Sequence, residues 1–153
     1  MEQKKIYSAS PEQTERAGAE LAQQLLDNSA LPRYIALYGD LGVGKTAFTR
    51  GVCQVLCPGA AVRSPTFALV NEYRGTPLSV FHFDMYRIES EDDLISIGYD
   101  DYLTRRGICL TEWSEKIEGE LPEERFSVLI EKLGAEVPNE RRITITHITE
   151  ENA

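Results

Sequence analysis

Hydrophobic and polar positions change period several times along this chain, and each change predicts the start of a new helix or strand. Small and apolar residues recur at helical spacing over residues 14–25, behind Ser10 as a helix cap and Pro11 at the first helical position. Residues 141–148 alternate between apolar and polar instead, which is typical of a half-buried strand. The chain therefore mixes both kinds of element from its first residues to its last.

The order of these elements predicts an α/β fold. The patterns predict strands over residues 4–8, 33–38, 68–74, 78–86, 107–112, 126–133 and 141–148. They predict helices over residues 11–27 and 45–56, and one or two short helices after residue 89 with a break at Gly98. The segment Gly75-Thr76-Pro77 separates two strands and predicts a hairpin. We therefore expect a mainly parallel central sheet with antiparallel strands, flanked by helices.

Length and apolar content bound the class of protein. A chain of 153 residues has the length of one domain, so we expect residues 1–153 to form a single domain with a flexible extreme C-terminus. No apolar run approaches the roughly 18 residues that a membrane span needs. The first residues lack the apolar segment of a signal peptide. These observations predict a cytoplasmic protein without membrane contact.

The charge balance limits which partners the chain binds directly. Its 25 acidic residues outnumber 16 basic ones, and the net charge is −9. Tight nucleic-acid binding needs a basic patch that displaces counterions from phosphates, and here basic residues cluster only in pairs such as Arg105-Arg106. If the chain acts on a nucleic acid, we expect a partner to make most of that contact.

A glycine-rich segment between a predicted strand and a predicted helix carries the most specific motif. It fits the P-loop pattern G-x-x-x-x-G-K-[ST] with Gly39, Asp40, Leu41, Gly42, Val43, Gly44, Lys45 and Thr46. Backbone N–H groups of such a loop cradle phosphates, Lys45 would reach the β- and γ-phosphates, and Thr46 would offer its hydroxyl to Mg²⁺. No N-K-x-D motif for guanine follows. We therefore expect a P-loop NTPase domain that binds ATP or ADP with Mg²⁺.

Two carboxylates and an aromatic residue follow predicted strands. A P-loop needs an acid at the end of a neighbouring strand to hold Mg²⁺, and Asp84 ends an apolar strand. Glu112 ends another strand and would act on the attacking water or on the metal, or be a surface carboxylate. Trp113 would stack on the nucleotide or a partner, or pack as an ordinary indole. Lys45, Asp84 and Glu112 are the candidate catalytic residues, and Thr46, Asp84 and Glu112 the candidate metal ligands.

Three further residues leave two interpretations each. His82 shares a strand face with Asp84 and would lie near the phosphates or be a hydrogen-bonded core histidine. Arg87 would act as an arginine finger or pair with a structural carboxylate. Thr66, in the segment Ser64-Pro65-Thr66-Phe67, would be a switch-like residue that senses the γ-phosphate, or part of a turn.

The segments GDLGVGKT, SPTF, FHFDMYR and TEW, in this order and at this spacing, resemble the bacterial TsaE (YjeE) family. These are small P-loop ATPases required for the threonylcarbamoyl modification of an adenosine beside the tRNA anticodon. The resemblance implies a P-loop sheet with an antiparallel portion. It also implies roles by position: phosphate binding for Lys45, Mg²⁺ binding for Thr46 and Asp84, a switch-like role for Thr66, an essential acid in Glu112 and an aromatic beside the nucleotide in Trp113.

The resemblance also implies partners. TsaE-like proteins work with TsaD, which transfers the threonylcarbamoyl group, and with TsaB, so that tRNA is reached only indirectly. The chain is then expected to be slow as an ATPase alone, to be stimulated by the partners and to reset their complex. A small-molecule kinase is the alternative within enzymes, although the acidic segment 89–102 is unlike an arginine-rich lid. A non-hydrolysing nucleotide-dependent scaffold is the alternative outside them.

Overall fold

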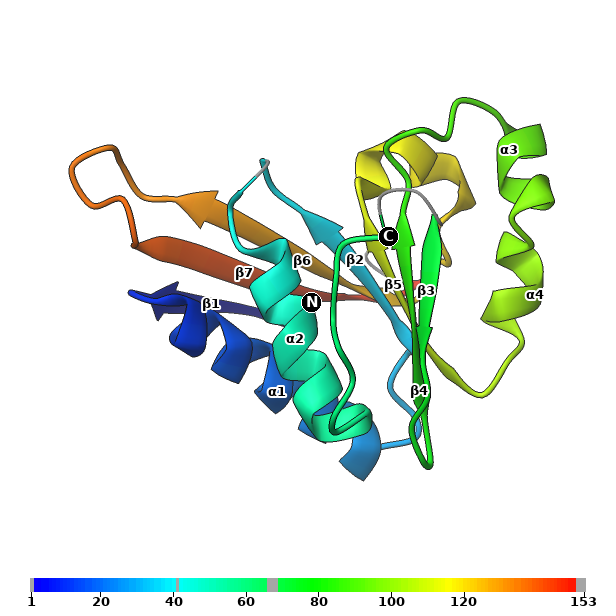
Figure 1. Ribbon diagram of the computed structural model, residues 1–153, viewed down its shortest axis with the longest axis horizontal. Coiled ribbons are helices and arrows are strands. Elements are labelled where there is room, and N and C mark those ends of the chain that lie inside the picture. The colour runs from blue at the N-terminus through cyan, green and yellow to red at the C-terminus, as the bar shows by residue number, and fades with distance from the viewer. Residues whose placement is uncertain (1, 41, 66–68, 151–153) are drawn as a thin grey trace.

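One mixed sheet organises the structure, a computed structural model that describes residues 2–40, 42–65 and 69–150 (Figure 1). Its seven strands have the order β1-β7-β6-β2-β5-β4-β3. The elements in chain order are β1 (Glu2–Ser8), α1 (Pro11–Asp27), β2 (Tyr34–Tyr38), α2 (Lys45–Leu56), β3 (Val70–Tyr73), β4 (Ser79–Asp84), α3 (Glu91–Ser96), α4 (Tyr99–Leu103), β5 (Gly107–Glu112), the 3₁₀ helix η1 (Ser114–Glu120), β6 (Arg125–Lys132) and β7 (Arg141–Ile148).

The four central strands are parallel. Strand β2 pairs in parallel with both β5 and β6, and β5 pairs in parallel with β4. Antiparallel strands complete the two sides, β3 on β4 and β7 with β1 on β6. The predicted class, a mainly parallel sheet with antiparallel strands and flanking helices, is confirmed. The carboxyl ends of the parallel strands share one edge, which is where open α/β sheets bind ligands.

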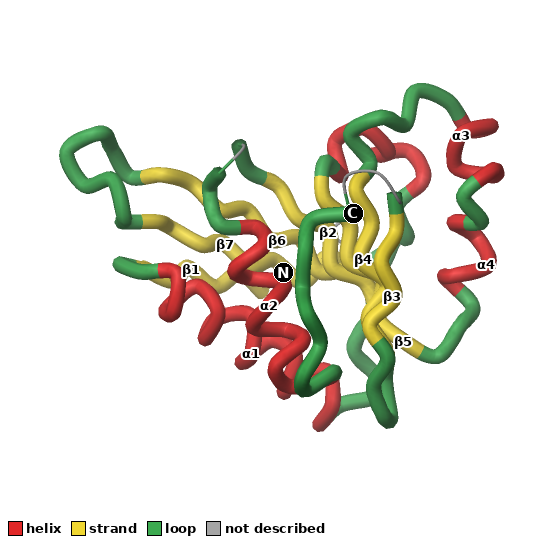
Figure 2. Tube along the Cα trace, viewed as in Figure 1, coloured by secondary structure: helices red, strands yellow, loops and turns green. Residues whose placement is uncertain are grey.

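The two faces of the sheet bury separate clusters of side chains. Successive residues of β2 point to opposite faces, so that Ile35 and Leu37 pack under α1 and α2 whereas Tyr34 and Ala36 pack with residues of α3, α4 and η1. Figure 2 shows α1 beside α2, and α3 with α4 apart from them. Each face is therefore covered by its own helices.

Two glycines let α1 and α2 meet backbone to backbone. A Cβ atom added to Gly51 would lie 1.8 Å from the carbonyl oxygen of Glu15, and one added to Gly18 would lie 2.2 Å from that of Phe48. Such distances exclude any side chain at either position unless the helices separate. This close contact fixes the position of α2, whose first residue is Lys45.

Most predicted elements agree with the structure within two or three residues at each end. The helices over 11–27 and 45–56 have the predicted bounds, and the helical stretch after residue 89 breaks at Gly98 as expected. The strand predicted to reach residue 86 ends at Asp84, because the Asp84 carboxylate accepts a hydrogen bond from the Tyr86 N–H and turns the chain. Helix η1 was not predicted.

Among the described residues, no helix is both long and apolar enough to cross a bilayer.

Candidate nucleotide site

The glycine-rich loop connects the end of β2 to the start of α2. Gly39, Gly42 and Gly44 have φ angles of 141°, 75° and 116°, a region that favours glycine. A Cβ atom at Gly39 would also lie 2.6 Å from the carbonyl oxygen of Ile130 on β6. Gly44 caps α2 without any side-chain hydrogen bond to the first turn. The first N–H groups of α2 are therefore presented by backbone alone, the arrangement that binds phosphate at helix N-termini.

Lys45 is held across this loop. Its side chain is buried, and its Nζ donates a hydrogen bond of 2.7 Å to the carbonyl oxygen of Gly39. The same Nζ lies 4.5 Å from the centre of the Trp113 ring, within the range of a cation–π contact. The ammonium group is thus placed between the first residue of the loop and the aromatic residue after β5.

An arginine from the far end of the chain supports the loop. Arg141, the first residue of β7, donates from Nε to the carbonyl oxygen of Val43 at 2.8 Å and from a terminal nitrogen to that of Pro138 at 2.7 Å. Sequence analysis missed this residue. Nothing local marks it, because 98 positions separate it from Val43.

The two candidate carboxylates end adjacent strands. Asp84 and Glu112 are the last residues of β4 and β5 and are direct partners in the sheet register. Alternation along the strands places both on the face that α2 covers. Glu112 is 5% exposed and Asp84 is half-buried. The sheet thus brings two carboxylates together beside the phosphate loop.

The strand order corrects one part of the sequence interpretation. The strand that ends at Asp84 was expected to neighbour the phosphate-loop strand, and this is wrong, because β5 lies between β2 and β4. The chain leaves β4 through α3 and α4 and then returns into the space between these two strands. Glu112, and not Asp84, therefore stands on the strand next to the loop.

Burial disfavours the ionised form of the Asp84 carboxyl group. It raises the pKa of Asp84 above the usual value, the N–H of Tyr86 lowers it, and the Glu112 carboxylate raises it again. Lys45 also lowers this pKa, which puts the ammonium group within electrostatic reach. A divalent cation at this position would favour the ionised form of the Asp84 carboxyl group.

His82 lies behind Glu112. It is fully buried, and its Nε2 is 2.5 Å from Oε2 of Glu112. Of the two interpretations of His82, the hydrogen-bonded core histidine agrees with this position, since no part of the ring reaches the surface. The side chain of Arg87 is exposed.

Trp113 projects from an unusual backbone position. It has φ 58° and ψ 43°, the left-handed region that few residues other than glycine adopt. Its ring lies 5.0 Å from that of Tyr86. A hollow of about 500 Å³ opens beside it, lined by Tyr38, Gly39, Asp40, Trp113, Glu115, Ser127 and Leu129. The tryptophan therefore borders both the phosphate loop and an open space large enough for part of a ligand.

Tyr86 is a second residue that sequence analysis did not single out. Its ring is more than half exposed and packs on Trp113. It belongs to the segment FHFDMYR, so the motif itself contained the signal.

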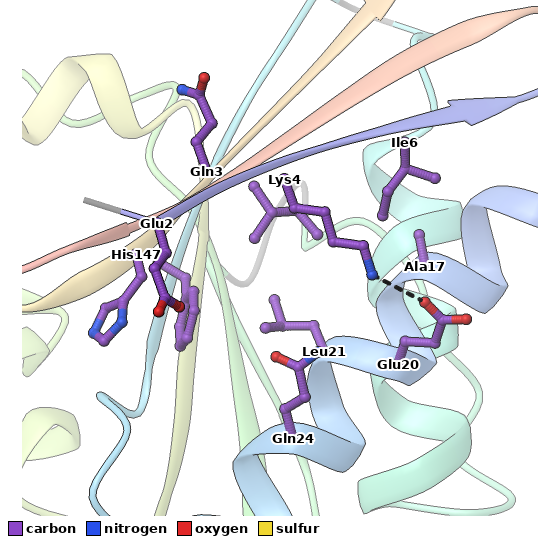
Figure 3. A pocket seen from close by; sticks show the side chains of 11 residues that line it. Glu2, Gln3, Lys4, Ile6, Ala17, Glu20, Leu21, Gln24 and His147 are labelled. Carbon is purple, nitrogen blue, oxygen red and sulfur yellow. Dashed lines mark ion pairs between the residues drawn. The ribbon is translucent and has the colours of Figure 1, made fainter.

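A second hollow, of about 260 Å³, lies away from the loop (Figure 3). It is bounded by β1, α1 and the end of β7 that carries His147, and the ion pair between Lys4 and Glu20 crosses it at 3.8 Å. His147 pairs in register with Phe126, near the start of β6. This hollow is therefore at the amino-terminal edge of the parallel strands, opposite the phosphate loop.

The residues of the loop edge fit a nucleoside triphosphate with Mg²⁺. Backbone N–H groups and Lys45 suit the phosphates, and the half-buried Thr46 in the first turn of α2 supplies a hydroxyl oxygen. Hydroxyl and carboxylate oxygens are the ligands that Mg²⁺ prefers, and it takes only one or two carboxylates beside phosphate. Leu41 and Thr66 lie outside the described residues, so the switch-like role of Thr66 stays a prediction.

Known proteins resemble this chain over most of its length. The family model "Threonylcarbamoyl adenosine biosynthesis protein TsaE" matches residues 8–143. The tRNA threonylcarbamoyladenosine biosynthesis protein TsaE of Bacillus subtilis is 38% identical over 97% of this chain and 88% of its own. The protein of the same name from Haemophilus influenzae is 42% identical over 74% of this chain and 70% of its own.

A solved structure agrees with these relatives. The crystal structure of Bacillus subtilis YdiB superposes with a TM-score of 0.76 and 34% sequence identity, and covers 99% of this chain and 89% of that one. The resemblance of the four motifs is thereby confirmed. The chain belongs to the TsaE family, nucleotide-binding P-loop proteins of tRNA threonylcarbamoyladenosine biosynthesis.

Proposed function

We propose that this chain is a Mg²⁺-dependent ATPase that supports the tRNA modification by binding and resetting a complex of TsaD and TsaB. The observation that carries the proposal is the meeting of Lys45, Asp84 and Glu112 at one edge of the sheet, where strand ends also place the phosphate loop. One chain, residues 1–153, would act as a single ATPase domain. The tRNA would be reached through the partners, in keeping with the net charge of −9.

The residues divide the chemistry among them. The loop N–H groups and Lys45 would hold the β- and γ-phosphates and stabilise the charge that spreads over the transferred group. Thr46 and Asp84 would hold Mg²⁺, which would offset the negative charge of the phosphates. Glu112 would orient the water that attacks the γ-phosphate in line with the leaving oxygen. Trp113 would pack against the nucleotide beside Lys45.

Partner dependence rests on the premise that a partner supplies the stimulating arginine and that the exposed Arg87 does not act as a finger. P-loop enzymes without an arginine finger hydrolyse slowly, and an arginine supplied by a partner accelerates them by about 10³–10⁵-fold. We therefore infer slow turnover by the chain alone and faster turnover in the complex. Hydrolysis would then bias the chain between partner-bound and released forms.

Two substitutions test the proposed site. Glu112→Gln keeps the volume of the side chain and removes its charge, so ATP turnover should fall by about 100-fold or more while nucleotide affinity changes little. Lys45→Ala removes the phosphate-binding cation, so ATP affinity, measured by titration calorimetry, should fall by about tenfold or more. Lys5→Ala, an exposed lysine on β1, is the matched control.

Either of two results would contradict the proposal. Wild-type ATP affinity in Lys45→Ala would mean that the phosphates do not bind where the loop predicts. Wild-type turnover in Glu112→Gln would remove Glu112 from the reaction and leave the assignment of the water unsupported.

A further inference from the structure

Glu112 is fixed by a partner that the proposed chemistry does not use. Its Oε2 lies 2.5 Å from Nε2 of His82, and the two side chains are 6% and 0% exposed. An ionised carboxylate only accepts hydrogen bonds, so the imidazole nitrogen is the donor. Hydrogen bonds to an ionised carboxylate are roughly twice as strong as those between neutral groups.

The ring of Tyr73 packs against the imidazole from its other side. The hydroxyl of Tyr73 on β3 lies 3.5 Å from Nδ1 of His82, and the two rings are tilted at 41° with centres 6.0 Å apart. That hydroxyl donates to the carbonyl oxygen of Arg63 at 3.0 Å and lies 3.0 Å from its N–H, which donates back. The amide of Asn71 also donates to it at 3.3 Å. Three buried side chains thus form a row across β3, β4 and β5.

The sheet register explains why this row selects one conformation of Glu112. His82 pairs with Leu110, two residue pairs before Asp84 pairs with Glu112. The Glu112 carboxylate therefore reaches back along its own strand to meet the imidazole. The bond to Nε2 uses one acceptor site of Oε2 and leaves Oε1 available for a ligand, and it restricts the three side-chain torsions of Glu112.

We propose that His82 is a positioning residue for the reaction: it orients Glu112 so that one carboxylate oxygen is presented to the attacking water, and Tyr73 holds the imidazole in place. This proposal rests on the ATPase function proposed above. His82 itself touches neither nucleotide nor water, since its ring is fully buried.

Glutamine and asparagine variants of His82 distinguish the positioning of Glu112 from simple packing in the core. Glutamine places its amide nitrogen close to the position of Nε2 and can still donate to Glu112, whereas asparagine reaches only the position of Nδ1. His82→Gln should keep kcat within about threefold of wild type, and His82→Asn should lose about 10–100-fold, as supporting partners of a reactive group do. The KM for ATP should stay nearly constant in both, because the phosphate loop is untouched.

The second histidine and Tyr73 complete the design. His147→Gln and His147→Asn are the matched controls. His147 lines the hollow of Figure 3, at the amino-terminal ends of the parallel strands, so both variants should keep wild-type kcat. Tyr73→Phe keeps the ring but removes the hydroxyl that anchors it to Arg63, so the ring should support His82 less well and kcat should fall by about threefold at constant KM. This variant tests the row with His82 present, in case His82→Asn does not fold by circular dichroism.

The outcomes are distinct. Equal kcat values in folded His82→Gln and His82→Asn, or a loss in Tyr73→Phe that appears only in KM, would overturn the positioning role while the wild-type ATPase stands. Absence of turnover in the wild-type protein, alone and with its partners, would overturn the ATPase proposal and this inference with it.

Discussion

At the scale of single residues, the site places two carboxyl groups close to each other and to one ammonium group in a partly dry environment. Asp84 and Glu112 are paired across adjacent strands, and Lys45 lies within electrostatic reach of Asp84. Carboxylates this close repel one another unless a cation lies between or beside them. The two charges that would bind a ligand therefore destabilise the folded protein when no ligand is bound, which is common at functional sites.

The destabilisation by Asp84 should be measurable as a pH dependence of protein stability. Because burial raises its pKa, the folded protein keeps this proton to a higher pH than the unfolded chain does. Stability therefore falls as pH rises from the usual range of an aspartate through the raised pKa. Asp84→Asn cannot ionise and keeps an oxygen for the Tyr86 N–H, so it should be more stable than wild type at pH 7 without Mg²⁺.

Urea denaturation at several pH values, in chelator, measures this difference. The advantage of Asp84→Asn should shrink as the pH is lowered toward the usual aspartate range, and the variant should lose the stabilisation that Mg²⁺ with ADP gives the wild type. A variant less stable than wild type at pH 7, or an advantage independent of pH, would contradict this reading of Asp84.

At the scale of elements, β7 contributes to a site that the sequence places in β2 and α2. The side chain of Arg141 binds the backbone of the phosphate loop at Val43 and the β6–β7 turn at Pro138. A loop of glycines has little to hold it in one conformation, so a tether from a rigid strand reduces the entropy that is lost when phosphate binds.

Arg141→Ala should therefore weaken nucleotide binding more than it weakens the fold. A hydrogen bond from a charged donor contributes about 1.5–3 kcal/mol to the conformation that it holds. Because only part of this energy would affect nucleotide binding, we expect the KM for ATP to rise by about 5–10-fold. Arg142→Ala is the control, since Arg142 pairs with Glu131 at 3.3 Å and both side chains are 41–50% exposed. Exposed pairs of this kind contribute about 0–1 kcal/mol, so Arg142→Ala should keep wild-type KM. Equal KM values in the two variants would show that Arg141 does not support the loop.

At the scale of the whole molecule, the sequence predicted what depends on near neighbours. Both ends of α2 were predicted, because the glycine before Lys45 and the proline and glycine after Cys57 are local signals. The phosphate loop was found for the same reason, since its eight residues are consecutive. The strand hairpin and the break at Gly98 also follow from turn residues.

What the sequence did not predict depends on residues far apart. The place of β5 between β2 and β4 is a property of the folded sheet, and no period in the sequence records it. The contact of His82 with Glu112 joins positions 30 apart, and both residues were considered without any reason to pair them. Helix η1 follows the left-handed residue Trp113, which carries no glycine or asparagine signal.

The most direct measurement is ATP hydrolysis by the purified chain, alone and with the TsaD–TsaB complex added, with Glu112→Gln assayed in parallel. We predict slow turnover by the chain alone, clear stimulation by the complex, and no stimulated turnover in Glu112→Gln. Nucleotide binding without hydrolysis, in the presence as well as the absence of the complex, would contradict the ATPase proposal and favour a nucleotide-dependent scaffold.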